Sequence, residues 1–289
     1  MTKPASASSV SLNPWRRHWG SALLLVPMLL VLGLFCLAPM AWVMLNSLRL
    51  DDGWGLDHYA EIFSSTFYLQ AFSYSLSLSL WSSVLGLIVA LWGAASLRRV
   101  PGRFREVVVA FVNMTSNLTG VPLAFAFIII VGANGAITLM LRQSGLVQDF
   151  YLYSLNGLIL IYTYFQIPLG LLLLYPAFDA LDDDWQAAAA LLGAKTWQYW
   201  LKVALPVLSP AILGTFILLF ANAMGAYASA YALTTGNFNL VTVRIASLVS
   251  GNVFLDPNLA AALSVMLVAL MALVTAVNQW LLKRSYHAR

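Results

Sequence analysis

The sequence predicts an all-α membrane protein with six transmembrane helices, because it is strongly apolar and its apolar residues fall into six long segments. Of the 289 residues, 61% are hydrophobic and 9% are charged, whereas soluble domains usually carry roughly 25% charged residues. Each segment is free of charge and long enough for the roughly 20 residues that a bilayer-crossing helix needs. The segments are 21–45, 71–97, 107–131, 154–175, 207–233 and 259–282.

This composition also excludes two classes of protein. An ordinary soluble enzyme would carry far more charge. A nucleic-acid-binding protein needs a basic face, but the basic residues here lie in short clusters between the apolar segments, despite a net charge of +4. We interpret these clusters as topology signals.

The distribution of Lys and Arg predicts that both termini are cytoplasmic. Cytoplasmic loops of membrane proteins are enriched in these residues. With the N-terminus inside, 12 of the 15 Lys and Arg residues lie on the cytoplasmic side and 3 lie outside. The chain then divides into an N-terminal tail (1–20), a six-helix transmembrane domain (21–282) and a C-terminal tail (283–289).

The longest ordered cytoplasmic segment, residues 181–206, is predicted to form a helix, a turn and a second helix. Asp182, Asp183 and Asp184 suit the positive end of a helix dipole, and the alanines that follow favour helix. Gly193 can supply the left-handed turn that ends this helix, and Pro206 marks the start of the fifth span. Three aspartates at the centre of a bilayer would cost about 9 kcal/mol, so the segment is expected in the cytoplasm.

This segment resembles a cytoplasmic motif of the permease subunits of binding-protein-dependent ABC importers. That family has Glu-Ala-Ala, three variable residues, Gly, and a hydrophobic-x-Leu-Pro end thirteen residues after the Gly. The glycine-to-proline spacing matches without a gap, and the glutamate of the motif is replaced by Ala187, preceded by Gln186. The matching positions are Ala187, Ala188, Ala189, Gly193, Val203, Leu205 and Pro206, with Ala194 and Trp197 also common at their places.

The resemblance, which covers roughly residues 71–282, implies a type I ABC importer permease in a bacterial inner membrane, working by alternating access. It implies partners: ATPase subunits, a second permease subunit (the same or a sister chain) and an extracytoplasmic solute-binding protein.

The resemblance also implies where ATP and solute are bound. ATP and Mg would be held by the ATPase, with no cofactor on this chain. The helix before Gly193 would dock in a groove of the ATPase, and the other interpretation is a connector lying on the membrane surface. The solutes suggested by appearance are polyamines, ferric iron and phosphonates.

Small residues recur at steps of three and four along the second segment. Such stripes let helices pack closely in lipid. We therefore expect helix packing, rather than a solute path, at Ser75, Ser79, Ser82, Gly86, Ala90 and Gly93.

Uncharged polar residues in the third, fourth and fifth segments are candidates for a solute pathway. Pro122 is expected to interrupt the third segment near its middle, and interrupted polar helices are where transporters place solute sites or gates. Hydrogen bonding between helices is the other interpretation. The pathway candidates are Asn117, Thr119, Pro122, Tyr164, Gln166, Asn222 and Tyr227.

Catalytic and ion-coupling signatures are missing from the sequence. The three histidines are far apart, there is no Gly-rich P-loop for ATP, and no ionisable Asp, Glu, Lys, Arg or His lies within a span. We expect a transport subunit that is not itself an enzyme and holds no metal. The alternatives are an ion-coupled secondary transporter and a membrane-embedded assembly protein.

Overall fold

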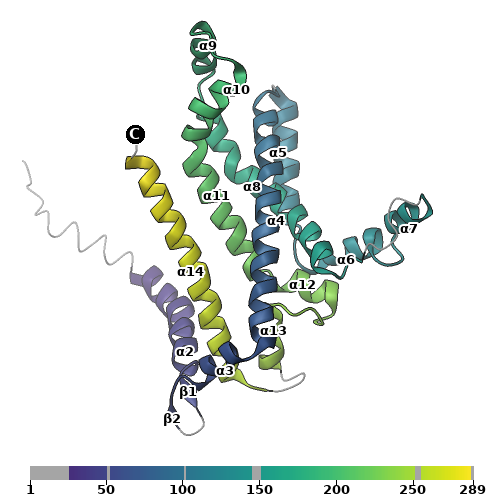
Figure 1. Cartoon of the computed structure of the whole chain (residues 1–289), viewed down its shortest axis with the longest axis vertical. Helices are drawn as coiled ribbons and strands as arrows, with labels where there is room; N and C mark the ends of the chain where they lie inside the picture. Colours follow the sequence, from purple (N-terminus) through teal and green to yellow (C-terminus); the bar gives the residue numbers. More distant parts are fainter. Residues whose placement is uncertain (1–25, 51–52, 101, 145–150, 251–254, 288–289) are drawn as a thin grey trace, which may run out of the picture.

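The computed structural model describes residues 26–50, 53–100, 102–144, 151–250 and 255–287, which fold almost entirely into helices (Figure 1). Within this part of the chain, six helical stretches are long and apolar enough to cross a membrane, which confirms the predicted fold class. The stretches are Val26–Asn46, Thr66–Arg98, Val121–Gln143, Leu155–Asp179, Thr196–Gly225 and Pro257–Trp280.

Three long helices form the centre of the bundle: α4 (Thr66–Arg98), α8 (Leu155–Asp179) and α11 (Leu205–Gly225). They pack so closely because α4 presents small side chains to its neighbours. A Cβ atom added at Gly86 would lie 2.7 Å from the Cβ of Gln166, and one at Gly93 would lie 2.8 Å from Leu171 Cδ1. Of the six residues in the stripe, Gly93 is half-buried and the other five are buried. The predicted packing role is therefore confirmed.

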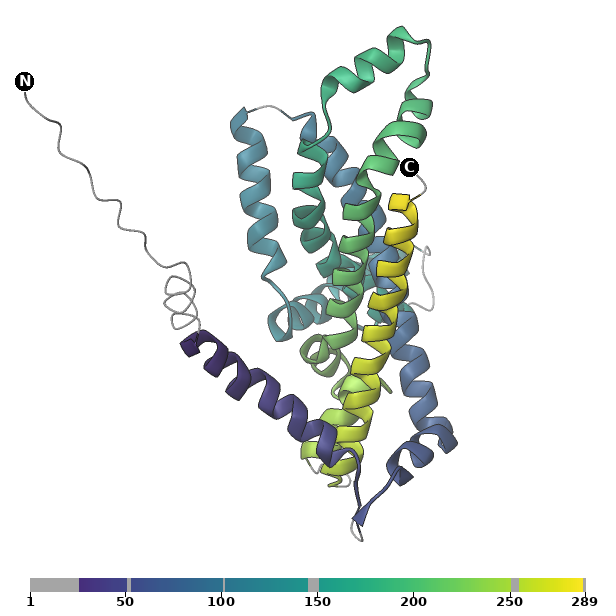
Figure 2. The same ribbon diagram turned by 90° about the vertical axis from the view of Figure 1, so that its left-hand side faces the viewer.

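The helices at one edge of the bundle connect through a small hairpin. A π-helical turn, η1 (Gly33–Leu37), precedes α2 (Ala38–Asn46), and the antiparallel strands β1 (Arg49–Leu50) and β2 (Gly53–Trp54) lead to α3 (Asp57–Ser64). The last helix, α14 (Pro257–His287), packs on α2 and on α13 (Val241–Ser250). In Figure 2, α2 leans away from the other long helices.

The third segment differs from its predicted form. Instead of one helix over 107–131, the chain forms α5 (Gly102–Ser116), a break at 117–120, and α6 (Val121–Val131). The break arises because Gly120 has a positive φ of 74° and Pro122, which has no N–H, sits in the first turn of the new helix. Pro122 thus begins a helix rather than kinking one. In Figure 1, α6 and then α7 (Ala136–Gln143) extend away from the bundle.

The fifth segment, predicted as one helix over 207–233, is also divided. The helix α11 ends at Gly225, Ala226 has non-helical dihedrals (φ −76°, ψ 86°), and α12 (Tyr227–Thr234) follows in a different direction (Figure 1). The predicted tail 1–20 and the start of the first segment, 21–25, lie outside the described residues. The other described boundaries agree with the predicted segments within a few residues, apart from the start of the second at Thr66 and the end of α14, which continues to His287.

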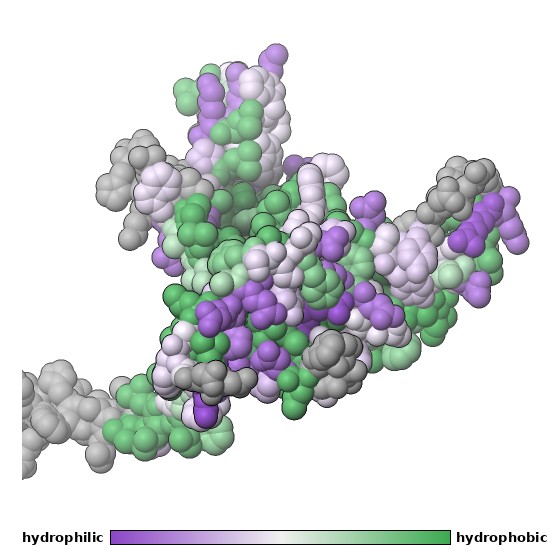
Figure 3. Space-filling model, turned by 60° about the horizontal axis from the view of Figure 1, so that its bottom comes forward, coloured by the Kyte–Doolittle hydropathy of each residue, from purple (hydrophilic) through white to green (hydrophobic). Residues whose placement is uncertain are grey.

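The two ends of the molecule differ in character. The end of α14 lies on the same side as α9 (Asp183–Leu191) and α10 (Thr196–Tyr199), whereas the hairpin, α3 and α13 lie at the opposite end (Figure 1). Seen from the hairpin end, hydrophilic residues gather near the centre and α2 at the edge is mostly hydrophobic (Figure 3). The end of the bundle that carries the hairpin therefore has a hydrophilic centre beside an apolar α2.

Candidate functional site

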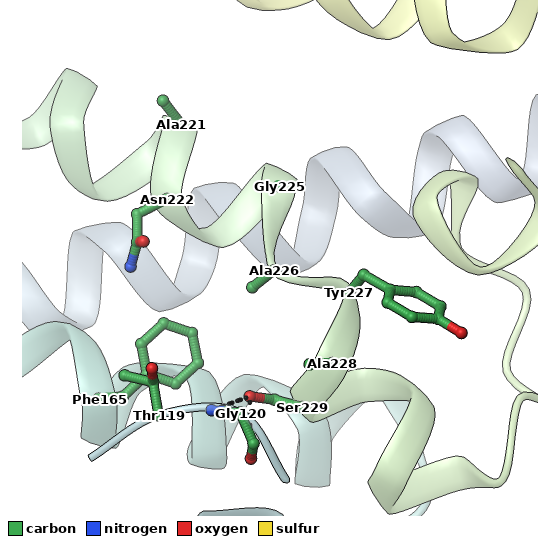
Figure 4. A pocket seen from close by; sticks show the side chains of 10 residues that line it. All are labelled: Thr119, Gly120, Phe165, Ala221, Asn222, Gly225, Ala226, Tyr227, Ala228 and Ser229. Carbon is green, nitrogen blue, oxygen red and sulfur yellow. Dashed lines mark hydrogen bonds between the residues drawn. The ribbon is translucent and has the colours of Figure 1, made fainter. Parts of the chain in front are cut away.

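A cavity of about 520 Å³ lies where the two divided helices meet. Figure 4 shows that its lining comes from the break before α6, from α8 and from both sides of the break between α11 and α12. The lining residues are Thr119, Gly120, Phe165, Ala221, Asn222, Gly225, Ala226, Tyr227, Ala228 and Ser229. Irregular backbone within an apolar bundle is tolerated where it lines such a cavity or is buried in protein.

The break between α5 and α6 is held by the other divided helix. The Gly120 N–H donates to Ser229 Oγ at 3.1 Å, and Ser229 is 3% exposed (Figure 4). On the other side of the break, the Asn117 side-chain amide donates to the Asn113 carbonyl at 2.8 Å. Backbone groups that lose helix partners are thus satisfied by side chains.

The break between α11 and α12 is held by a buried tyrosine. Tyr162 of α8 is fully buried, and its hydroxyl donates to the Ala226 carbonyl at 2.5 Å. That carbonyl lies at the non-helical residue, so the hydroxyl supports the backbone at the point where the helix changes direction.

Behind the cavity, the fully buried Gln166 side chain joins the three central helices. Its Nε2 donates to the Leu219 carbonyl of α11 at 2.6 Å and to Ser83 Oγ of α4 at 3.3 Å. Its Oε1 accepts from Asn222 Nδ2 at 3.3 Å. A buried amide is tolerated in a bundle when its donors and acceptor are paired in this way.

The structure gathers some of the predicted pathway residues and separates others. Thr119, Asn222 and Tyr227 line the cavity, and Gln166 contacts it through Asn222. Tyr164 instead lies 41% exposed with its ring 5.1 Å from that of Phe127, on α6. Asn117 and Pro122 are exposed beside the break and are not among the lining residues.

Seven of the ten lining residues were not among the predicted pathway residues: Gly120, Phe165, Ala221, Gly225, Ala226, Ala228 and Ser229. Gly120 could have been found, because a glycine two residues before a proline is typical of the start of a new helix. Phe165 and Ser229 carried no such signal, since their role depends on contacts with segments far away in the sequence.

The second candidate region is segment 181–206, and it forms the predicted helix, turn and helix. Asp182 Oδ1 accepts from the Asp184 N–H at 3.0 Å and begins α9. Gly193 has φ +79°, and the bonds Gly193 N–H to Ala190 O and Ala194 N–H to Ala189 O end the helix. The Gln198 side chain accepts from the Lys195 N–H at 2.8 Å and begins α10.

A π-helical turn, η2 (Trp200–Ala204), joins α10 to α11 just before Pro206. Proline has no N–H and its ring crowds the preceding turn, so a wider turn at this point accommodates it. The helix then continues without a break from Thr196 to Gly225. The segment at one end of the molecule and the cavity are therefore joined by a single helical stretch.

Most of the residues matched to the permease motif are exposed on this segment. Gln186, Ala187, Ala188, Gly193, Trp197 and Leu205 are exposed, and Ala189, Ala194 and Pro206 are half-buried. Two further residues at the end of α9, Leu191 and Leu192, are 90% and 88% exposed. In the sequence, both leucines fit the helical pattern and nothing marks them as exposed.

An ion pair and hydrogen bonds fix the base of this segment to the bundle. Arg98 of α4 donates to the Leu181 carbonyl at 2.5 Å. Arg105 of α5 binds both carboxylate oxygens of Asp179, at 2.6 and 2.5 Å, and lies 4.7 Å from the centre of the Tyr175 ring. The start of the segment is thus held by groups from two helices while its α9 tip remains exposed.

Broken helices around a cavity in an apolar bundle are typical of membrane transporters. A family model described as "Binding-protein-dependent transport system inner membrane component" matches residues 82–285. Because this match covers more than half of the chain, the chain belongs to that family, the permeases of binding-protein-dependent ABC importers.

Curated relatives are similar at lower identity. The thiamine permease ThiP of Escherichia coli (strain K12) is 25% identical over 212 residues, covering 73% of this chain but 39% of ThiP. The molybdenum permease ModB of Mycobacterium tuberculosis (strain ATCC 25618 / H37Rv) is 28% identical over 66% of this chain and 69% of its own. The sn-glycerol-3-phosphate permease UgpA of Escherichia coli O6:K15:H31 (strain 536 / UPEC) is 26% identical over 91% and 94%.

Two solved structures share the fold. A chain of a bacterial ABC transporter that imports the acidic polysaccharide alginate superposes with a TM-score of 0.75 at 18% identity, covering 93% of this chain and 96% of that one. A chain of the MetNI methionine ABC transporter gives 0.58 at 16% identity, covering 75% and 95%. The divided helices thus occur in a fold that importers use.

Proposed function

We propose that this chain is one of two permease subunits in an importer that is driven by separate ATPase subunits and supplied by an extracytoplasmic solute-binding protein. The importer would lie in a bacterial inner membrane, with α9, α10 and both termini in the cytoplasm. ATP and Mg would be bound by the ATPase. The cavity between the divided helices would accept a small polar solute, and alternating access would expose it to each side in turn.

The observation that carries this proposal is the pair of almost fully exposed leucines at the end of α9. Leu191 and Leu192 follow three aspartates and precede Lys195, so the segment is too polar to lie in lipid. Large apolar side chains exposed on a polar segment mark a protein interaction site. The small side chains of Ala187 and Ala188 beside them leave room for close approach of a partner's backbone. We therefore assign this tip to the ATPase contact.

The helical stretch from Thr196 to Gly225 provides the mechanical link. It begins beside the proposed ATPase contact and ends at the break that lines the cavity. A push on α9 would reach the cavity along one rigid element, which is how a packed helix transmits displacement.

Replacing both leucines tests the ATPase contact. Leu191→Glu with Leu192→Glu should abolish co-purification with the ATPase subunit, because charges would replace the apolar contact. Gly193→Trp should weaken it too, since Gly193 has a positive φ that other residues adopt at a cost of roughly 1 kcal/mol. Leu56→Glu is the matched control: Leu56 is 65% exposed at the opposite end of the molecule. Unchanged co-purification of the double variant would contradict the proposal.

The cavity chemistry supports a neutral or anionic solute rather than a cation. None of the ten described residues that line it is Asp or Glu, so no carboxylate faces a cation there. Both α6 and α12 begin at its rim and α11 ends there, so two partly positive helix N-termini meet one partly negative C-terminus. Of the solute types suggested by sequence, the phosphonate type fits best, and the named solutes of ModB and UgpA are molybdenum and sn-glycerol-3-phosphate.

Uptake measurements test this solute class. Cells that express the complete importer should accumulate a radiolabelled alkylphosphonate or another small oxyanion, and unlabelled oxyanion should compete. Accumulation of labelled spermidine or ferric iron instead would overturn the assignment of solute class while leaving the permease assignment intact.

A further inference from the structure

Gln166 has one hydrogen-bonding position that depends on a cavity residue. Its two amide hydrogens are used by Leu219 O and Ser83 Oγ, in the interior of the bundle. Its carbonyl oxygen, Oε1, accepts from Asn222 Nδ2 at 3.3 Å, and no other donor to it occurs among the residues that the structure describes. If the Asn222 amide turned away, a fully buried acceptor would be left without a partner, which is unfavourable.

Asn222 contacts both the cavity and Gln166. Its side chain is exposed to the cavity and points from α11 toward Thr119 and Phe165 in Figure 4. The same amide reaches Gln166 through a hydrogen bond of 3.3 Å. This bond is longer than most hydrogen bonds between an N–H and an oxygen. A polar solute in the cavity would therefore meet a donor that is held only weakly by the protein.

We propose that Asn222 is a positioning residue through which solute occupancy changes the packing of α4, α8 and α11. A solute that turns the Asn222 side chain into the cavity breaks its bond to Gln166, and the unpaired Gln166 then loosens the junction of the three helices. This inference rests on the proposed function, because it needs the cavity to hold solute and α11 to reach the ATPase contact.

The position of Asn222 along α11 gives the junction a route to the ATPase. Asn222 lies three residues before the end of the helix at Gly225, and Leu219 lies one turn earlier. From there the helical stretch runs without a break to Thr196, beside the exposed tip of α9. If the contacts among α4, α8 and α11 near Asn222 loosen, the cavity end of this helical stretch becomes free to move. The other end of the stretch, near Thr196, is the end that the ATPase would push.

The test uses ATP hydrolysis by the permease assembled with its cognate ATPase in lipid nanodiscs, with neither binding protein nor solute present. Asn222→Ala removes the donor and should raise this basal hydrolysis about tenfold, the factor that corresponds to one unpaired buried acceptor. Gln166→Met removes the acceptor together with the bonds that Gln166 donates to Leu219 O and Ser83 Oγ, and should raise hydrolysis at least as much. The double variant should not exceed Gln166→Met, because Asn222→Ala acts only through its contact with Gln166.

Asn278→Ala is the matched control. Asn278 of α14 is buried, and its amide donates to the Leu213 carbonyl of α11 at 3.2 Å, away from the cavity. This substitution also removes an asparagine hydrogen bond that involves α11, and it should change hydrolysis less than twofold.

Two results would overturn the inference: wild-type hydrolysis by Asn222→Ala, or an equal rise in Asn278→Ala, which would mean that any loosening of α11 suffices. Both leave the proposed function standing. Failure of the unmodified chain to assemble with its ATPase would overturn the proposed function, and the inference with it.

Discussion

Two pairs of helices pack in the same apolar bundle in different ways. One pair, α4 and α8, is continuous, and the other pair, α5/α6 and α11/α12, is divided. The first pair is continuous for 33 and 25 residues and packs through small residues. The second pair gives up backbone hydrogen bonds at two breaks and recovers them through Ser229 and Tyr162. We call the continuous helices α4 and α8 the frame, because they form the rigid part of the bundle. The divided helices form the part that can hold a solute.

The largest effect is expected from filling the close contact in the frame. Even the Cβ of a side chain at position 86 would lie 2.7 Å from the Gln166 Cβ. Because overpacking of this kind is costly, Gly86→Leu should lower the free energy of unfolding by about 3 kcal/mol. Unfolding in SDS followed by circular dichroism would measure it.

Gly214 provides the control for Gly86. A Cβ at Gly214 of α11 meets nothing within 4 Å. Gly214→Ala should therefore stabilise the helix by about 0.5–1 kcal/mol. Gly86→Ala should instead destabilise, because its Cβ would crowd the Gln166 Cβ. Equal effects of the two alanine variants would show that close packing does not distinguish the two positions.

The next largest effect is expected from removing the Tyr162 hydroxyl, which stabilises the break between α11 and α12. Tyr162→Phe should cost about 1–3 kcal/mol, because the Ala226 carbonyl loses its buried donor. Tyr164, two residues further along α8, is 41% exposed. Its replacement by Phe should change stability by less than about 0.5 kcal/mol. Equal effects of the two variants in the same SDS titration would refute a role for the hydroxyl at the break.

Ser229→Ala should have a smaller effect, about 1 kcal/mol, because the Gly120 N–H that it leaves lies on the cavity and water can reach it. Hydrogen exchange at the Gly120 amide should become faster in this variant. Unchanged exchange would mean that the hydroxyl does not protect that amide.

The smallest effect is expected at the ion pair between Arg105 and Asp179. Their side chains are 29% and 41% exposed, so solvent screens the interaction. Asp179→Asn should therefore cost less than about 1 kcal/mol. The loss should shrink further in high salt. An effect that is large and independent of salt would show that the pair does more than anchor α5.

The sequence predicted the continuous parts of the fold better than the divided parts. Long charge-free segments locate α8 and α14 because crossing length and apolarity are local properties. The break at Gly120 had a local signal in glycine and proline. The break at Ala226 had little, since it is held by Tyr162 from another helix. Tyr164 was grouped with Gln166 as a pathway residue, although residues two apart on a helix lie on different faces, so helical periodicity could have separated the two.

The pairing of α2 with α14 has a consequence for how the protein is made. The helix α2 lies in the first span that the structure describes and α14 in the last, and the two pack against each other. During synthesis α2 therefore lies in the lipid without its partner helix until α14 has been made and inserted. Its side chains are mostly exposed and apolar, which suits a helix that has to be stable in the bilayer alone. Premature release of the chain before α14 would leave α2 inserted but undocked.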